Sequence, residues 1–180
     1  MKNTMAMVQA IATQTLRGVS DREAVEAFAD RLQALSRAHD LLLDQNWASA
    51  NLTQIIAGVA YAHAERARFK LSGPELRLHP NAALSVTLLL HELATNAVKY
   101  GALSESEGVV QVIWSHDGAV FVLNWMENGG PPVFEPSRNG FGTRLIDEGI
   151  VGTKDVKKSY RLLGFRAEFR APLNPIQPET

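Results

Sequence analysis

The chain has 180 residues, of which 46% are hydrophobic and 21% are charged, so its composition is that of a folded globular protein of about one domain. Its 18 basic and 19 acidic residues leave a net charge of −1, which argues against a nucleic-acid binder or a polybasic membrane-surface protein. The sequence has no cysteine, no apolar run of membrane-spanning length and no signal-peptide pattern, so disulfides and cysteine chemistry are excluded and we expect a cytoplasmic location.

Residues 1–46 are expected to form an antiparallel helical hairpin. Apolar residues recur at helical spacing on both sides of Gly18, and the segment SDRE (20–23) matches the S-x-x-E capping box that begins a helix. The second helix carries a heptad-like seam: Val25, Phe28, Leu32, Leu35, His39 and Leu42. Two helices alone bury too little surface, so we expect the hairpin to dock on the rest of the chain or to dimerise.

Residues 47–173 are expected to form an α+β domain, followed by a Pro-rich tail at 174–180. Asn51 can cap one helix, and Pro80 opens a second, strongly apolar one. The predicted helices are 52–66, 80–100 and 145–150, and the predicted strands are 70–71, 76–78, 109–114, 119–125, 156–163 and 165–171. The strands come mainly as hairpins, so we expect a mostly antiparallel sheet with helices on one face.

The first candidate cluster is the segment HELATNAVKYG (91–101) on the long helix. Glu92, Asn96 and either Lys99 or Tyr100 are spaced so that they lie on one face of this helix. A carboxylate beside a carboxamide suits Mg²⁺, which prefers oxygen ligands and keeps water or phosphate oxygens. A lysine one turn further on would meet phosphates. The alternative is a solvated polar helix face, which this segment alone would favour.

Two further clusters follow in the chain. In WMENGGP (125–131), Glu127 comes at the end of a strand, where a carboxylate can accept from an exocyclic amine, although an acidic turn is the simpler explanation. In GFGTRLI (140–146), a G-x-G opens a helix whose N-terminal N–H groups favour phosphate. Residues 128–142 predict a long irregular loop, which in compact domains is usually functional or mobile.

Together the three clusters resemble the Bergerat-type ATP-binding fold. The details are similar to the HWE family of sensor histidine kinases, named for a histidine in the first motif and a Trp-x-Glu in the second, here His91, Trp125 and Glu127. The segments KNTMAMVQAIATQTLR (2–17) and RLQALSRAHDLL (31–42) resemble the two dimerisation helices of that family. The resemblance extends over residues 2 to 172. It implies that three distant stretches fold into one pocket for Mg-ATP.

The resemblance also implies roles for individual residues. Asn96 would ligate Mg²⁺, and Glu92 would stand beside it and polarise a water or the metal. Glu127 would bind adenine. The catalytic set would be Glu92, Asn96 and His91, with His91 orienting this helix or a neighbour. The remaining ATP-binding positions would line the phosphates or hinge the lid: Lys99, Tyr100, Gly129, Gly140, Gly142, Thr143 and Arg144.

One departure concerns the phosphate acceptor. The family's acceptor histidine lies in an H-R-x-K-N segment, and Met1 stands at the x of that pattern before Lys2 and Asn3, so the chain is expected to lack its own acceptor. His39-Asp40 resembles the acceptor dipeptide of other histidine kinases, but its place in the apolar seam favours packing. His63 and His116 are expected at the surface, and the three tryptophans in the core.

The sequence therefore predicts the transmitter core of a two-component histidine kinase. Its expected partners are ATP, a response-regulator receiver domain and a second copy of the chain through the N-terminal helices, without nucleic acid or membrane. One alternative is a dimeric scaffold that docks response regulators and carries a non-catalytic ATP domain. Another is a different Bergerat ATPase, such as a chaperone or topoisomerase fragment, against which the helical hairpin and the Trp-x-Glu motif argue.

Overall fold

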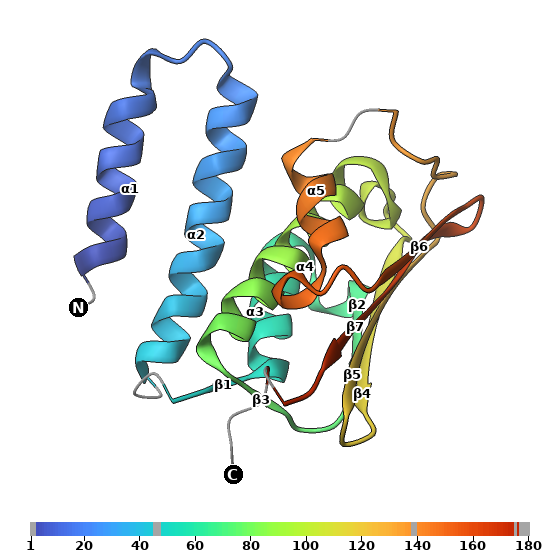
Figure 1. Ribbon diagram of the computed structural model, residues 1–180. Helices are drawn as coiled ribbons and strands as arrows, with labels where there is room; N and C mark the ends of the chain where they lie inside the picture. The colour runs from blue at the N-terminus through green and yellow to red at the C-terminus, as the bar shows by residue number, and fades with distance from the viewer. Residues whose placement is uncertain (1–2, 45–47, 138–139, 175, 177–180) are drawn as a thin grey trace.

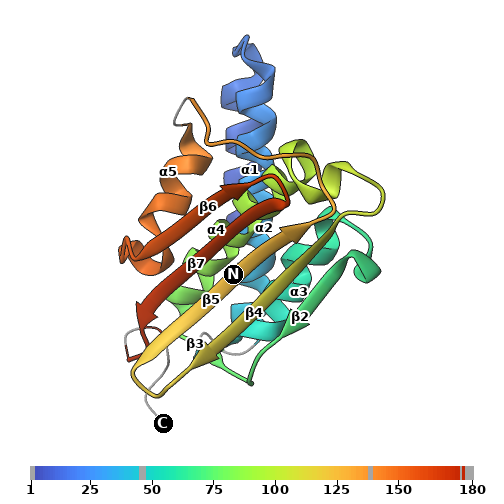
Figure 2. The ribbon, with the colours of Figure 1, turned by 90° about the vertical axis from the view of Figure 1, so that its right-hand side faces the viewer.

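The computed structural model describes residues 3–44, 48–137, 140–174 and 176. Three layers follow one another across the molecule: a pair of long N-terminal helices, a layer of shorter helices and a twisted sheet (Figure 1). The helical layer covers one face of the sheet, and the opposite face is open (Figure 2). The predicted fold class, a helical hairpin followed by an α/β sandwich with a mostly antiparallel sheet, is confirmed.

The N-terminal hairpin consists of α1 (Asn3–Thr15) and α2 (Arg22–Asp44), joined through the 3₁₀ turn η1 (Leu16–Gly18). The start of α2 differs from the capping-box prediction, because Asp21 rather than Ser20 is the capping residue. Its Oδ1 atom accepts a hydrogen bond from the backbone N–H of Ala24 at 3.0 Å. Capping by Asp21 leaves Ser20 outside the helix, one position before the cap.

The hairpin docks on the rest of the chain through α2. In Figure 1, α1 lies on the outer side of α2, away from the helical layer. On the inner side, Ala34, Ala38 and Leu42 of α2 are fully buried. Among the seam residues, Phe28 remains exposed, whereas His39 is half-buried. Hence the seam is only partly covered within one chain.

The main sheet has five strands in the order β2-β4-β5-β7-β6. Their bounds are β2 (Phe69–Ser72), β4 (Val109–His116), β5 (Val120–Asn128), β6 (Val156–Arg161) and β7 (Gly164–Pro172). β2 pairs with β4 in parallel, and the other neighbours pair antiparallel: β4–β5 and β6–β7 are the two expected hairpins, and β5–β7 joins them. The two strands predicted at 70–78 do not pair with each other: β3 (Arg77–Leu78) instead pairs with β1 (Ala50–Asn51) in a separate ribbon.

Three helices cover the inner face of the sheet: α3 (Leu52–His63), α4 (Pro80–Tyr100) and α5 (Phe141–Glu148). The predicted cap of α3 is confirmed, since Asn51 Oδ1 accepts from the Gln54 N–H at 3.2 Å. This helix ends before the predicted Arg66, which belongs to the turn η2 (Arg66–Arg68). α5 begins four residues before the predicted Leu145, and the turns η3 (Ala102–Ser104) and η4 (Ile150–Gly152) complete the layer.

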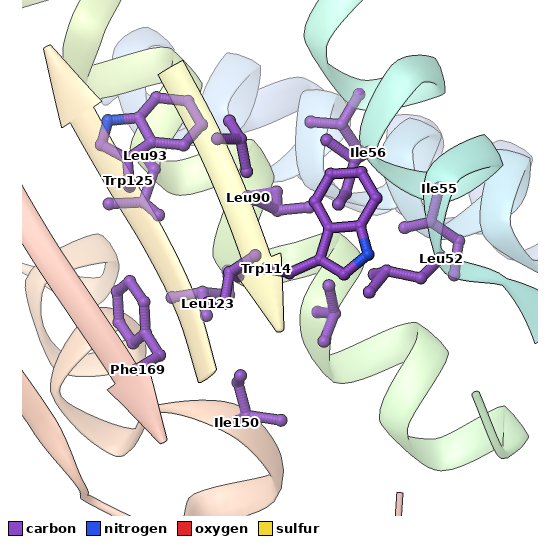
Figure 3. Close-up of a cluster of buried hydrophobic side chains, with 14 of the residues drawn as sticks. Leu52, Ile55, Ile56, Leu90, Leu93, Trp114, Leu123, Trp125, Ile150 and Phe169 are labelled. Carbon is purple, nitrogen blue, oxygen red and sulfur yellow. The ribbon is translucent and has the colours of Figure 1, made fainter. Parts of the chain in front are cut away.

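One continuous hydrophobic core lies between this helical layer and the sheet (Figure 3). Trp125 and Trp114 are buried in it as predicted, and the indole N–H of Trp114 donates to the carbonyl of Pro74 at 2.8 Å. The third tryptophan, Trp47, lies outside the described residues. Among the helices that the structure describes, none is both long and apolar enough to cross a membrane.

Candidate functional site

A cavity of about 870 Å³ opens between α2, the C-terminal half of α4, the end of β5 and the start of α5. Eight of the residues predicted from the three motifs line it: Glu92, Asn96, Lys99, Tyr100, Glu127, Gly140, Gly142 and Thr143. His91, Gly129 and Arg144 are not among the lining residues. The three motifs, far apart in the sequence, therefore meet at one cavity.

At one end of the cavity, Glu127 explains the Trp-x-Glu spacing. Residues two apart in a strand point to the same face, so Trp125 and Glu127 both face inward from β5. The indole N–H of Trp125 donates to Glu127 Oε1 at 2.9 Å, and the backbone N–H of Ala102 donates to Oε2 at 2.9 Å. Burial raises the pKa of Glu127 despite these two donors. Trp125 and Ala102 thus fix the orientation of a buried carboxyl group.

The loop that carries Ala102 is held in place by Arg68. The guanidinium group of Arg68 donates to the carbonyl oxygens of Gly108 at 2.9 Å and Ala102 at 3.3 Å, and also to those of Leu103 and Glu105. These bonds add partners to four carbonyl groups of the loop, of which those of Ala102 and Glu105 also accept from the backbone N–H groups of Glu105 and Gly108. Arg68 therefore fixes the loop whose N–H group positions Glu127.

At the opposite end, Glu92 is paired with an arginine from the helical hairpin. Arg31 of α2 donates to Glu92 through Nε at 2.5 Å and through Nη2 at 2.8 Å, which is a bidentate pair. The side chain of Glu92 is 4% exposed and that of Arg31 is 23% exposed. The start of α5 closes over this pair, because a Cβ atom on Gly142 would lie 2.4 Å from Glu92 Oε2.

Asn96 and Lys99 lie between these two ends. The half-buried carboxamide of Asn96 faces the cavity one turn after Glu92, and the exposed Lys99 forms an ion pair of 3.5 Å with Glu23 of α2. Lys158 of β6 adds another cation to the lining. The lining thus holds three cations, Arg31, Lys99 and Lys158, each paired with a carboxylate, and Glu127 lies where Gly101 ends α4. This arrangement suits a ligand with a polar base at one end and negative charge at the other.

His91 lies in the helical layer and not at the cavity. Its buried ring packs edge-on against His63 of α3, with the ring centroids 4.9 Å apart. His63 is itself half-buried, so its predicted surface position is wrong. Its Nδ1 atom lies 2.9 Å from the carbonyl oxygen of Val59, which makes Nδ1 the donor, and Thr95 Oγ1 lies 3.4 Å from its Nε2 atom. The two histidines thus join α3 to the motif helix α4.

Burial, followed by the neighbouring His63, lowers the pKa of His91 to about 4, although Glu92 and Asp30 act in the opposite direction. We therefore expect stability to fall as the pH is lowered from 6.5 to 4, because the unfolded chain binds a proton there that the folded chain excludes. The free energy of unfolding should fall by about 2 kcal/mol over this pH range, allowing for solvent screening. Urea unfolding at a series of pH values measures it.

The matched variants for this test are His91→Phe and His116→Gln. His91→Phe should flatten the dependence of the unfolding free energy on pH between 6.5 and 4. His116 is exposed at the end of β4, so His116→Gln should leave that dependence as in the parent chain. Equal slopes in all three proteins would contradict the buried neutral His91.

The residues that the sequence prediction missed include Arg31, Ala102, Arg68 and Lys158. Only Arg31 had a signal in the sequence. It lies in a second stripe of α2 whose other members are small. These members are spaced as in a heptad: Ala24, Ala27, Ala34 and Ala38. Alanines at such spacing allow a neighbouring helix to approach closely, and a single arginine in that stripe must find a buried partner. Arg68 donates to backbone carbonyl groups, and Ala102 donates through its backbone N–H group. Contacts of this kind leave no pattern in the sequence.

Comparisons with known proteins identify relatives of the chain. Residues 1–75 match the family model for HWE histidine kinases. The chain is 42% identical, over 183 aligned residues, to a blue-light-activated histidine kinase of Brucella ovis, and the match covers 97% of this chain and 37% of the relative. The chain therefore spans little more than a third of the length of the curated relatives it matches.

Solved structures show the same fold. The histidine kinase domain of the blue-light activated histidine kinase EL346 from Erythrobacter litoralis is similar with a TM-score of 0.62 at 18% identity, over 97% of this chain and 88% of that one. The histidine kinase ThkA, crystallised in complex with the response regulator protein TrrA, is similar with a TM-score of 0.50 at 12% identity, over 97% of this chain and 59% of that one. With the Brucella sequence and the family model, these findings show that the chain belongs to the HWE histidine kinase family.

Proposed function

We propose that this chain is the transmitter core of a two-component sensor histidine kinase, which binds Mg-ATP in the cavity between α2, α4 and α5. The observation that carries the proposal is that eight motif residues from three distant segments line this one cavity. The γ-phosphoryl group would pass to a histidine and then to an aspartate of a response regulator, so the enzyme would be a protein-histidine kinase.

Glu127 would bind the adenine end. Each carboxylate oxygen has two lone pairs, so Glu127 can keep its bonds from Trp125 and Ala102 and still accept from an exocyclic amine. A Cβ atom on Gly101 would lie 1.9 Å from Glu127 Oε2, so the glycine leaves room for the carboxyl group against the helix end. The lone pairs left over at a fixed, buried carboxyl group provide selectivity for a base with an amino group.

Asn96 would hold Mg²⁺, with Lys99, Thr143 and the N–H groups at the start of α5 facing the phosphates. The residues present fit this ion. Asn96 brings a carboxamide oxygen to the cavity, and Mg²⁺ usually takes one or two protein oxygen ligands together with phosphate oxygens. When bound, Mg²⁺ would neutralise charge on the phosphates. Because Arg31 engages Glu92, Asn96 is the better placed ligand.

The helical hairpin would supply the dimer contact and the docking surface for a response regulator. Exposed apolar side chains of the hairpin, including Val8, Ile11 and Phe28, would be covered by a second copy in a four-helix bundle. The half-buried His39 would remain a packing residue rather than a phosphate acceptor.

A nucleotide titration tests the proposal. We expect a non-hydrolysable ATP analogue to bind with micromolar affinity and to require Mg²⁺, as measured by calorimetry. Absence of binding would support the scaffold alternative. Steady ATP hydrolysis without any histidine acceptor would instead support a different Bergerat ATPase.

Replacing Glu127 by glutamine tests the adenine role. The amide can no longer accept from both Trp125 and Ala102 and also from the base, so the preference for adenine over guanine nucleotides should fall about tenfold. Competition titrations with ADP and GDP measure the ratio. Glu107→Gln makes the same change at an exposed position and should leave the ratio as it is. An unchanged ratio in Glu127→Gln would remove adenine recognition from this residue.

A further inference from the structure

The hairpin helix α2 forms one wall of the cavity. Its capping residue Asp21 and four residues of the helix line the space that the motif residues enclose: Glu23, Ala24, Ala27 and Arg31. The small side chains of Ala24 and Ala27 leave room there, and Arg31 is the basic residue among the five. The cavity is therefore incomplete without the hairpin, although the motif residues that line it all belong to the segment after it.

The guanidinium group of Arg31 is oriented from two directions. Its Nε and Nη2 atoms are bonded to Glu92, and its Cζ atom lies 4.6 Å from the centre of the Phe141 ring in the G-x-G turn. The bonds to Glu92 occupy the Nε–Nη2 edge of the guanidinium group, so Nη1 takes no part in this pair. A fork held in this way loses little entropy when it takes a further partner.

The position of Arg31 corresponds to the phosphate end of the cavity. It touches Glu92, which is one turn before Asn96, and it contacts Phe141 between Gly140 and Gly142 at the helix N-terminus. Both neighbours belong to the region assigned above to the triphosphate. A planar guanidinium binds phosphate oxygens in pairs, which a solvated lysine such as Lys99 cannot do.

We propose that Arg31 recognises the terminal phosphate of the bound nucleotide, so that the helical hairpin supplies part of the ATP site. This inference rests on the proposed function and extends it to a residue outside the nucleotide motifs. The terminal phosphate would bridge α2 and α4, because it contacts Arg31 on one helix and the region of Asn96 on the other. ATP and ADP would then differ in how firmly they hold the hairpin against the cavity.

Titrations of the full chain with AMP, ADP and a non-hydrolysable ATP analogue test the proposal. In Arg31→Met we expect the preference for the ATP analogue over ADP to fall about tenfold, with AMP affinity unchanged. Arg31→Lys should recover only part of that preference, since it restores the charge without the fork. Arg22→Met is the control: it removes the same charge from the same helix at a residue on the α1 side.

A second readout is hydrogen exchange in α2. The ATP analogue should slow exchange over residues 22–44 more than ADP does in the parent chain, and the two nucleotides should act alike in Arg31→Met. Arg31→Met leaves Glu92 buried without its partner, so the comparison is repeated with Arg31→Met/Glu92→Gln against Glu92→Gln alone. Folding of each variant is verified by its thermal unfolding.

The outcomes separate the two proposals. If the parent chain binds none of the three nucleotides, the ATP site and the role of Arg31 both fail. If it binds all three and Arg31→Met retains the full preference for the ATP analogue, only the role of Arg31 fails. An equal loss for AMP, ADP and the analogue would show that Arg31 merely supports the packing of α2, and would also overturn the inference.

Discussion

Asn96→Ala should abolish Mg²⁺-dependent nucleotide binding while the fold survives. Asn96 is half-buried and lines the cavity, so truncation removes an oxygen ligand without opening the hydrophobic core. Outer-shell partners of a metal are worth ten- to a hundredfold in affinity, so loss of a direct ligand should cost on the order of a hundredfold or more. Calorimetric titration of an ATP analogue with and without Mg²⁺ measures the effect.

The matched control is Asn81→Ala, which makes the same truncation at an exposed position on the same helix and should change the affinity by less than about twofold. The specific signature of a metal role is that Asn96→Ala removes the difference between titrations with and without Mg²⁺. Unaltered affinity, or an equal loss in both conditions, would refute the assignment of Asn96 as a metal ligand.

Gly130→Ala should destabilise the protein by about 3 kcal/mol and remove nucleotide binding, because it overpacks backbone against backbone. A Cβ atom on Gly130 would lie 2.5 Å from the Cα atom and 2.7 Å from the backbone nitrogen of Ala102. That nitrogen donates to Glu127, so any shift that relieves the clash also moves the donor that orients the carboxyl group. Urea unfolding and nucleotide titration measure the two effects.

Gly140→Ala provides the comparison. The position opens the third glycine motif, but a Cβ atom there would meet no other atom within 4 Å, and the backbone is extended with φ of −82°. The Gly140→Ala variant should therefore differ from the parent chain by less than about 0.5 kcal/mol in its free energy of unfolding. If Gly130→Ala proved as harmless as Gly140→Ala, the close approach of residues 129–130 to the loop after α4 would be wrong.

The chain order of the elements was predictable because the signals that specify them are local. Apolar residues at helical spacing predicted α4, alternating residues predicted β4 and β5, and Asp117-Gly118 predicted the turn that joins these two strands. In that turn, Asp117 Oδ1 accepts from the N–H groups of Ala119 and Val120, a contact within three residues. Errors arose at element ends, as at Ser20 and Leu145, where neighbouring residues compete to begin a helix.

Pairing between distant segments was less predictable. The strands around residue 71 and residue 77 read as one local unit, but β2 pairs in parallel with β4, and β3 pairs with β1. A parallel pair needs a crossover, and here that crossover contains the whole of α4. Which strand accepts β2 depends on how α3 and α4 pack on the sheet, and residues 69–78 do not encode that packing.

For the candidate site, the sequence alone determined which residue types were available: a carboxylate and a carboxamide one turn apart, an acid after a strand and a glycine turn before a helix. Tertiary structure decided what each of them contacts. Glu92 meets Arg31 across 61 residues, and Glu127 meets Ala102 across 25. Periodicity tells which residues lie on one face of an element, but only packing determines which element that face meets. The hairpin arginine in the cavity therefore became visible only in three dimensions.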